Sequence, residues 1–144
     1  RCLTKNTYNA FLNLSTAMKN DIGQDIFIRS AWRSFKTQQL TVISSPELAA
    51  TAGRSEHQLG TAIDFSHVNT QEREDVFSNT AQYQWMLKHA HEFGFVQTYQ
   101  EWNAVQAPWE PWHYRYVGVS VAKDIFETND DVAGYIHRIA ESKI

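Results

Sequence analysis

Residues 60–66 constrain the fold most, because a carboxylate stands inside a strand pattern that is otherwise largely apolar. On such a strand Ile63 and Phe65 share one face and Asp64 lies on the other. A lone carboxylate there is costly unless it meets a cation or hydrogen-bond donors. The pattern therefore predicts that other polar groups converge on Asp64 in the folded chain.

Helical and strand patterns alternate irregularly along the rest of the sequence. Thr4 is a plausible helix N-cap, and a helical stretch is also expected to begin at Asn69 or Thr70. The expected helices cover residues 4–20, 35–43, 80–93, 119–127 and 130–142, and the expected strands cover residues 26–28, 95–99 and 112–117. There is no regular strand–helix–strand rhythm, so the prediction is an α+β fold with helices packed on a small antiparallel sheet.

Length and composition narrow the class of protein further. The 144 residues fit a single domain spanning 1–144, and a hydrophobic fraction of 42% with 20% charged residues is typical of a globular chain. A net charge of -3 without a basic cluster argues against nucleic acid as a partner. No apolar run reaches the ~20 residues of a membrane span. The single cysteine, Cys2, excludes an internal disulfide, and nothing demands more than a monomer.

The chain begins with Arg1 rather than with methionine. We therefore expect a processed or trimmed piece, from which a signal peptide or membrane anchor would have been lost upstream.

His57 and Asp64 are a nitrogen and an oxygen ligand type seven residues apart, and Gly60 between them permits a tight turn. Taken alone, such a pair is more often an ordinary surface pair. His113 adds a third candidate ligand. Two histidines and one carboxylate leave a tetrahedral Zn²⁺ with one open position, which is the layout of a hydrolytic site.

Glu110, three residues before His113, is the candidate general base. Its expected task is to take a proton from the zinc-bound water and to pass it to the departing amine. Residues three apart point to opposite faces of a regular strand. Both can therefore face one cleft only if the chain bends near Pro111 or if Glu110 precedes the strand. The alternative is a solvated loop carboxylate.

Arg33 is the candidate substrate anchor, because a hydrolase that trims a chain end must recognise a free carboxylate. Gln38 follows it about one helical turn later. Stabilisation of the oxyanion, or an exposed surface position, are the alternatives for Arg33. Trp112 fits core packing and a pocket wall equally well.

Three ordered segments resemble the VanY-type D-alanyl-D-alanine carboxypeptidases, a zinc peptidase group that includes the LdcB/DacB-type L,D-carboxypeptidases and some phage endolysins. The segments are Trp32-Arg33-Ser34 with Gln38, Ser55-Glu56-His57 with Gly60-Thr61-Ala62-Ile63-Asp64, and Glu110-Pro111-Trp112-His113-Tyr114-Arg115-Tyr116-Val117-Gly118. The resemblance runs in order from about Phe27 to Ile136. Trp32 and Gln100 stand where the family often has tyrosine and proline, which bears on substrate fit but not on the metal chemistry.

The resemblance implies a Hedgehog/D-Ala-D-Ala zinc peptidase-like fold that holds Zn²⁺. It implies His57, Asp64 and His113 as zinc ligands. It also implies Glu110 and Arg33 as catalytic residues. The substrate-binding residues that it implies, with Trp112 as a candidate wall, are Arg33, Gln38, Ser55 and Tyr99.

The expected function is therefore a zinc-dependent carboxypeptidase that removes a terminal D-alanine from peptidoglycan stem peptides, on the extracytoplasmic side of the cell. D,D and L,D specificity both remain open. The alternatives are a peptidoglycan endopeptidase of the endolysin type and a non-catalytic, zinc-stabilised wall-binding module.

Overall fold

The computed structural model describes residues 2–47, 49–69 and 76–142. Its α-helices are α1 (Lys5–Ile22), α2 (Phe35–Ser44), α3 (Ala81–His89), α4 (Val119–Thr128) and α5 (Val132–Glu141). Its strands are β1 (Phe27–Ser30), β2 (Ala62–Ser66), β3 (Phe95–Gln97) and β4 (His113–Tyr116), and short 3₁₀ turns form η1 (Glu56–Leu59), η2 (Phe77–Asn79) and η3 (Ala90–Phe93). The helical stretch expected from Asn69 or Thr70 falls on residues 70–75, outside the described residues.

The four strands form one antiparallel sheet in the order β1-β2-β4-β3, which confirms the predicted α+β class. Strand β2 is central and every one of its residues is buried. Its alternation is as expected, since Phe65 packs against the ring of Tyr114 on the neighbouring strand at a centroid distance of 5.7 Å. Asp64 lies on the other face.

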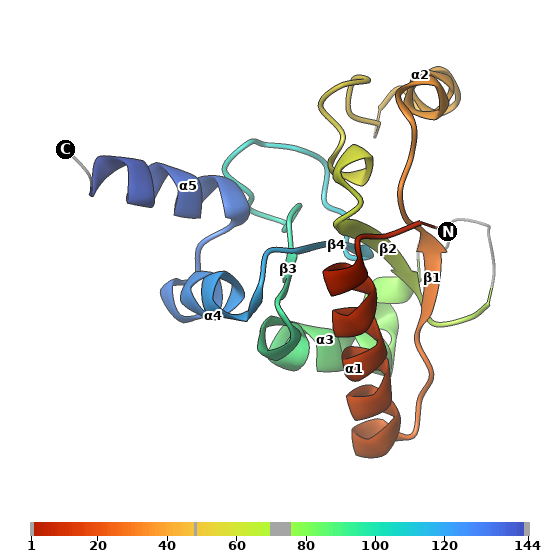
Figure 1. The fold of residues 1–144 in the computed structure, drawn as a ribbon, viewed down its shortest axis with the longest axis vertical. Coiled ribbons are helices and arrows are strands. Elements are labelled where there is room, and N and C mark those ends of the chain that lie inside the picture. Colours follow the sequence, from red (N-terminus) through yellow and green to blue (C-terminus); the bar gives the residue numbers. More distant parts are fainter. Residues whose placement is uncertain (1, 48, 70–75, 143–144) are drawn as a thin grey trace.

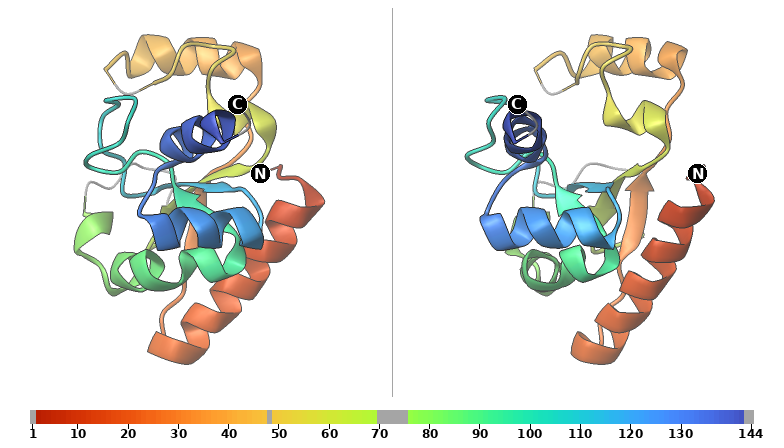
Figure 2. Two further views of the ribbon diagram at one scale, coloured as in Figure 1. Left: turned by 90° about the vertical axis from the view of Figure 1, so that its left-hand side faces the viewer. Right: turned by 60° about the vertical axis from the view of Figure 1, so that its left-hand side comes forward.

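Helices α1 and α3 lie on one side of the sheet and α2 lies on the other (Figures 1 and 2). The core lies between the sheet and helices α1 and α3. Its most deeply buried members are Leu14, Met18, Ile63, Phe65, Phe77, Met86 and Phe95. This apolar layer supports β2 from below, so the polar side chains of the sheet can gather on the opposite face.

The beginning of α1 is tied to the segment that precedes β2. The hydroxyl of Thr4 caps α1 by accepting from the backbone N–H of Thr7, as the sequence predicts. The backbone N–H of Thr4 donates to the carbonyl of Gly60 at 3.0 Å. Gly60 has φ +71°, a left-handed conformation that lets η1 stop and β2 start at once.

Helix α4 packs over β3 through a second apolar cluster of Val96, Ala122 and Ile125, which Val132 at the start of α5 joins. Helix α5 follows after a short turn and runs away from the sheet (Figure 1). None of the described helices combines the length and the apolar character that crossing a bilayer requires.

Candidate active site

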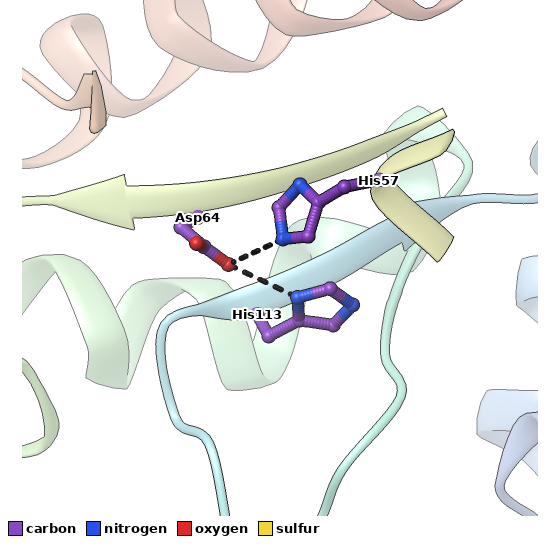
Figure 3. Close-up of side chains that lie close together, drawn as sticks. All are labelled: His57, Asp64 and His113. Atoms are coloured by element: carbon purple, nitrogen blue, oxygen red, sulfur yellow. Dashed lines mark hydrogen bonds and ion pairs between the residues drawn. The ribbon is translucent and has the colours of Figure 1, made fainter. Parts of the chain in front are cut away.

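The strand register brings two of the three predicted ligands together. Asp64 on β2 is the direct partner of His113 on β4, and the short η1–Gly60 connection carries His57 over the same face. Oδ1 of Asp64 lies 3.0 Å from Nδ1 of His113 and 3.2 Å from Nε2 of His57 (Figure 3). One nitrogen or oxygen of each side chain lies within 4.8 Å of the others.

The outer nitrogen of each imidazole is held by a buried acceptor. His57 donates from Nδ1 to the carbonyl oxygen of Ala31 at 2.7 Å. His113 donates from Nε2 to Oε2 of Glu56 at 3.0 Å. The nitrogens that face Asp64 are therefore Nε2 of one ring and Nδ1 of the other, and both are placed to act as ligands.

The charges at this point fit a cation. Burial works against ionisation, but His57 and His113 more than offset it and hold the pKa of Asp64 well below its usual range. Burial also works against a charged His113, yet its hydrogen bonds to Asp64 and Glu56 raise the pKa of His113 to about 9. The carboxylates of Asp64 and Glu56 thus stabilise a protonated His113 in the metal-free fold. The same two imidazoles and the Asp64 carboxylate suit a divalent metal, which would displace that proton.

Glu110 reaches the cleft in the way that the sequence required. The N–H of His113 donates to the carbonyl of Glu110 at 3.1 Å, which closes a turn at Pro111 just before β4. The carboxylate of Glu110 lies 3.8 Å from Nδ1 of His113, the nitrogen that faces the metal position. Burial raises the pKa of Glu110 to about 7, a value suited to a general base near neutral pH.

Arg33 is fixed by two neighbours. Its Nη1 donates to Oε1 of Gln38 at 3.0 Å, and Nη2 donates to Oδ2 of Asp64 at 3.5 Å. Gln38 is itself buried and donates to the carbonyl of Ala50 at 2.7 Å. Burial lowers the pKa of Arg33. Within the described residues its Nε is buried without a hydrogen-bond partner, while the side chain lines the cavity beside the ligand candidates.

A cavity of about 390 Å³ joins these groups. Ser55, Tyr99 and Trp112 line it together with the three ligand candidates, Glu110, Arg33 and Gln38. The ring of Tyr99 lies 4.9 Å from that of His113, and burial raises the pKa of Tyr99 to about 12. Trp112 serves both of its predicted alternatives, because it belongs to the main core and also forms a wall of the cavity.

Arg29 is a member of this cavity that the sequence reasoning missed. The register of β1 slips between Ile28 and Ser30, which leaves Arg29 as the extra residue of a β-bulge. Its Nη2 lies 3.4 Å from Oδ2 of Asp64, and its guanidinium lies 5.5 Å from the ring centre of Trp112. No motif marks a bulge in advance, so the sequence carried no signal for this placement.

Glu56 is the second residue of the site that the sequence reasoning missed. It stands inside the quoted motif beside His57, but its sequence position shows nothing of its contact with His113, 57 residues away. Arg115 and Thr98 also donate to its carboxylate, at 3.0 and 2.8 Å. A signal was present for Arg115, which shares a strand face with His113 two residues earlier.

Comparison with known proteins agrees with this geometry. The family model VanY, D-alanyl-D-alanine carboxypeptidase, matches residues 1–119. The putative carboxypeptidase YodJ of Bacillus subtilis (strain 168) is 28% identical over 151 residues, which covers 96% of this chain and 55% of that protein. The chain therefore spans about half the length of this curated relative.

Solved structures share the fold. The structure of the LdcB LD-carboxypeptidase matches with a TM-score of 0.83 at 29% identity, over 94% of this chain and 68% of that one. A mutant of the vancomycin resistance D,D-pentapeptidase VanY from the VanB-type cassette, in complex with Zn(II), matches with a TM-score of 0.78 at 23% identity, over 93% and 83%. Because the family model covers most of the chain, the protein belongs to the VanY family of D-alanyl-D-alanine carboxypeptidases.

Proposed function

We propose that this protein is a zinc-dependent carboxypeptidase that removes a terminal D-alanine from peptidoglycan stem peptides. One observation carries the proposal. His57, Asp64 and His113 present three ligand atoms at the wall of a cavity that also holds Glu110 and Arg33. The family and its relatives, which include an LD-carboxypeptidase and a D,D-pentapeptidase, support the choice of peptide end.

Nε2 of His57, Oδ1 of Asp64 and Nδ1 of His113 would hold the metal. A VanY relative binds Zn(II), and a set of two histidines and one carboxylate matches the preference of zinc in hydrolytic sites. When bound, zinc supplies an activated water and polarises a carbonyl group. The hydrogen bonds from the outer ring nitrogens to Ala31 and Glu56 leave the inner nitrogen of each ring to face the metal position.

Glu110 moves the proton in this proposal. Its carboxylate accepts the proton of the attacking water and then donates it to the amine that leaves as free D-alanine. Two features support the role: its place beside the metal-facing nitrogen of His113 and a pKa raised to about 7 by burial. A group with such a pKa both takes and returns a proton near neutral pH.

Arg33 orients the substrate by its terminal carboxylate. Gln38 and Asp64 hold the guanidinium in place, and its Nε–H points to no partner within the described part of the chain. Ser55 and Tyr99 line the same space, so a short peptide end would lie between the arginine and the metal ligands. Since wall peptides lie outside the cytoplasm, we place the action of the protein there.

Incubation with defined muropeptides tests the proposal. Peptides that end in one or two D-alanines, each with a free or an amidated end, are digested with and without a chelator and analysed by mass spectrometry. We expect loss of one alanine from a free end only, and no loss with chelator. Equal cleavage of amidated peptides would indicate an endopeptidase, and wall binding without released alanine would indicate a binding module.

A further inference from the structure

The carboxylate of Glu56 is held in a frame of three donors. Its Oε2 accepts from Nε2 of His113 at 3.0 Å and from the hydroxyl of Thr98 at 2.8 Å. Its Oε1 accepts from Nη1 of Arg115 at 3.0 Å. The side chain of Glu56 is 12% exposed, so water competes little with these contacts.

Glu56 lies behind the metal site rather than inside it. The residues that line the catalytic cavity include His113 but not Glu56. Glu56, Thr98 and Arg115 instead line a separate cavity of about 360 Å³. Glu56 is thus placed to act on the reaction through the ring of His113 and not by touching a substrate in the catalytic cavity.

The hydrogen bond to Glu56 decides which nitrogen of His113 carries a proton. A carboxylate that already receives hydrogen bonds from Arg115 and Thr98 acts as an acceptor, so the bond requires a hydrogen on Nε2 of His113. A neutral ring then keeps its lone pair on Nδ1, which faces Asp64 at 3.0 Å. In the opposite tautomer the hydrogen would occupy the ligand position.

His57 offers an internal reference for this argument. Its Nδ1 donates to the backbone carbonyl of Ala31, which no side-chain substitution removes. The two ligand histidines are therefore oriented by different means, one by the main chain and one by a side chain. A substitution at Glu56 changes the acceptor of His113 and leaves that of His57 in place.

We propose that Glu56 is a positioning residue that fixes His113 in the tautomer whose Nδ1 binds the metal. The inference rests on the ligand set of the proposed function but not on the proposed substrate. Arg115 contributes to this positioning, because its salt bridge to Oε1 of Glu56 turns Oε2 toward His113.

Glu56→Gln gives the sharpest variant because it preserves shape. An amide that keeps its oxygen on Arg115 turns its NH₂ toward His113, and this favours the wrong tautomer. An amide that turns its oxygen toward His113 sets NH₂ against the guanidinium of Arg115. Arg115→Met removes this conflict, so the double variant allows the glutamine oxygen to accept from His113 again.

The test measures zinc affinity by chelator competition. It also measures the tautomers of both histidines by ¹⁵N NMR of the metal-free protein, at a pH high enough for the rings to be neutral. In Glu56→Gln we expect a zinc dissociation constant raised ~10- to 100-fold, with His113 shifted toward its Nδ1–H form and His57 unchanged. Arg115→Met alone should raise the dissociation constant less than Glu56→Gln does, because Oε2 of Glu56 can still accept from His113, and the double variant should recover affinity relative to Glu56→Gln. Glu127→Gln, on the exposed surface of α4, is the matched control.

Wild-type zinc affinity and an unchanged His113 tautomer in Glu56→Gln would overturn the proposal. A loss of affinity that Arg115→Met does not reduce would overturn it as well. Neither measurement uses a peptide, so failure to release D-alanine would count against the proposed function alone.

Discussion

Asp64 and His113 face each other across β2 and β4, with Oδ1 and Nδ1 only 3.0 Å apart. Antiparallel pairing fixes this contact through the backbone, since residues directly opposite on one face have Cβ atoms ~5 Å apart. Two of the three proposed ligands are therefore positioned by the sheet itself. The third, His57, depends on the turn that leads into β2.

That turn gives a prediction with a built-in comparison. Gly60 has φ +71° and Gly23 has φ +68°, and a Cβ at either position meets no contact closer than 3.5 Å. Alanine at either site thus introduces the same backbone strain, ~1–2 kcal/mol, and both variants should unfold at lower denaturant. Only Gly60→Ala should also weaken zinc binding, because only that turn places His57. Equal zinc affinity in the two variants would contradict the account.

Replacement of Glu110 separates metal binding from turnover. Glu110→Gln removes the base but none of the proposed ligands, so we expect a kcat lower by ~10²–10⁴-fold with one zinc still bound per chain. Steady-state kinetics and metal analysis check both parts. Glu101→Gln, an exposed loop position, is the control. A Glu110→Gln enzyme with normal kcat would remove this residue from the mechanism.

Arg33→Met should act mainly on substrate binding. Loss of the guanidinium leaves the substrate carboxylate buried without its partner, and we expect kcat/KM to fall on the order of 10²-fold, with most of the change in KM. Kinetics on free-end peptides measure this split. A fall confined to kcat would assign Arg33 to the oxyanion instead of the carboxylate.

Zinc binding should strengthen as the pH rises. The pKa of His113 in the metal-free fold is about 9, raised from 6.5, and a metal must displace that proton. Affinity should therefore increase by about tenfold per pH unit between pH 7 and 9. Chelator competition at several pH values gives the slope, and an affinity independent of pH in this window would contradict a shared proton on His113.

The raised pKa of His113 also makes the stability of the metal-free fold depend on pH, but this stability falls as the pH rises. A folded-state pKa above the unfolded value stabilises the protein below pH 6.5, and this contribution is lost as the pH rises to about 9. The free energy of unfolding without metal should accordingly decrease between pH 7 and 9. Denaturant titrations of the metal-free protein check it, and a contribution that grows in that range would have the wrong sign.

The candidate ligands could be predicted from the sequence because their short spacing limits where their side chains can lie. His57, Gly60 and Asp64 stand on one short turn and strand, and Glu110 and His113 stand on one turn, so each pair is local. Only the meeting of the two pairs is a tertiary fact. The family resemblance predicts that the two pairs meet, and the register between β2 and β4 shows how they do so.

The remaining features follow from tertiary contacts that have no local signature. Arg29 enters the cavity through a bulge, and Glu56 reaches His113 across 57 residues of sequence. Strand β3 ends at Gln97 rather than at the expected Tyr99, because its ladder with β4 stops at the pair Gln97–Tyr114 and the carbonyl of Tyr99 accepts from Glu110 instead. Strand β4 likewise begins one residue late because the Pro111 turn precedes it.

Location of the metal tests the central claim most directly. A crystal of the zinc-loaded protein, measured at the zinc absorption edge, shows where the ion lies. We expect one anomalous peak ~2.0–2.2 Å from Nε2 of His57, Oδ1 of Asp64 and Nδ1 of His113. A zinc-loaded, active protein whose peak lies elsewhere, or which shows none, would contradict the proposed site.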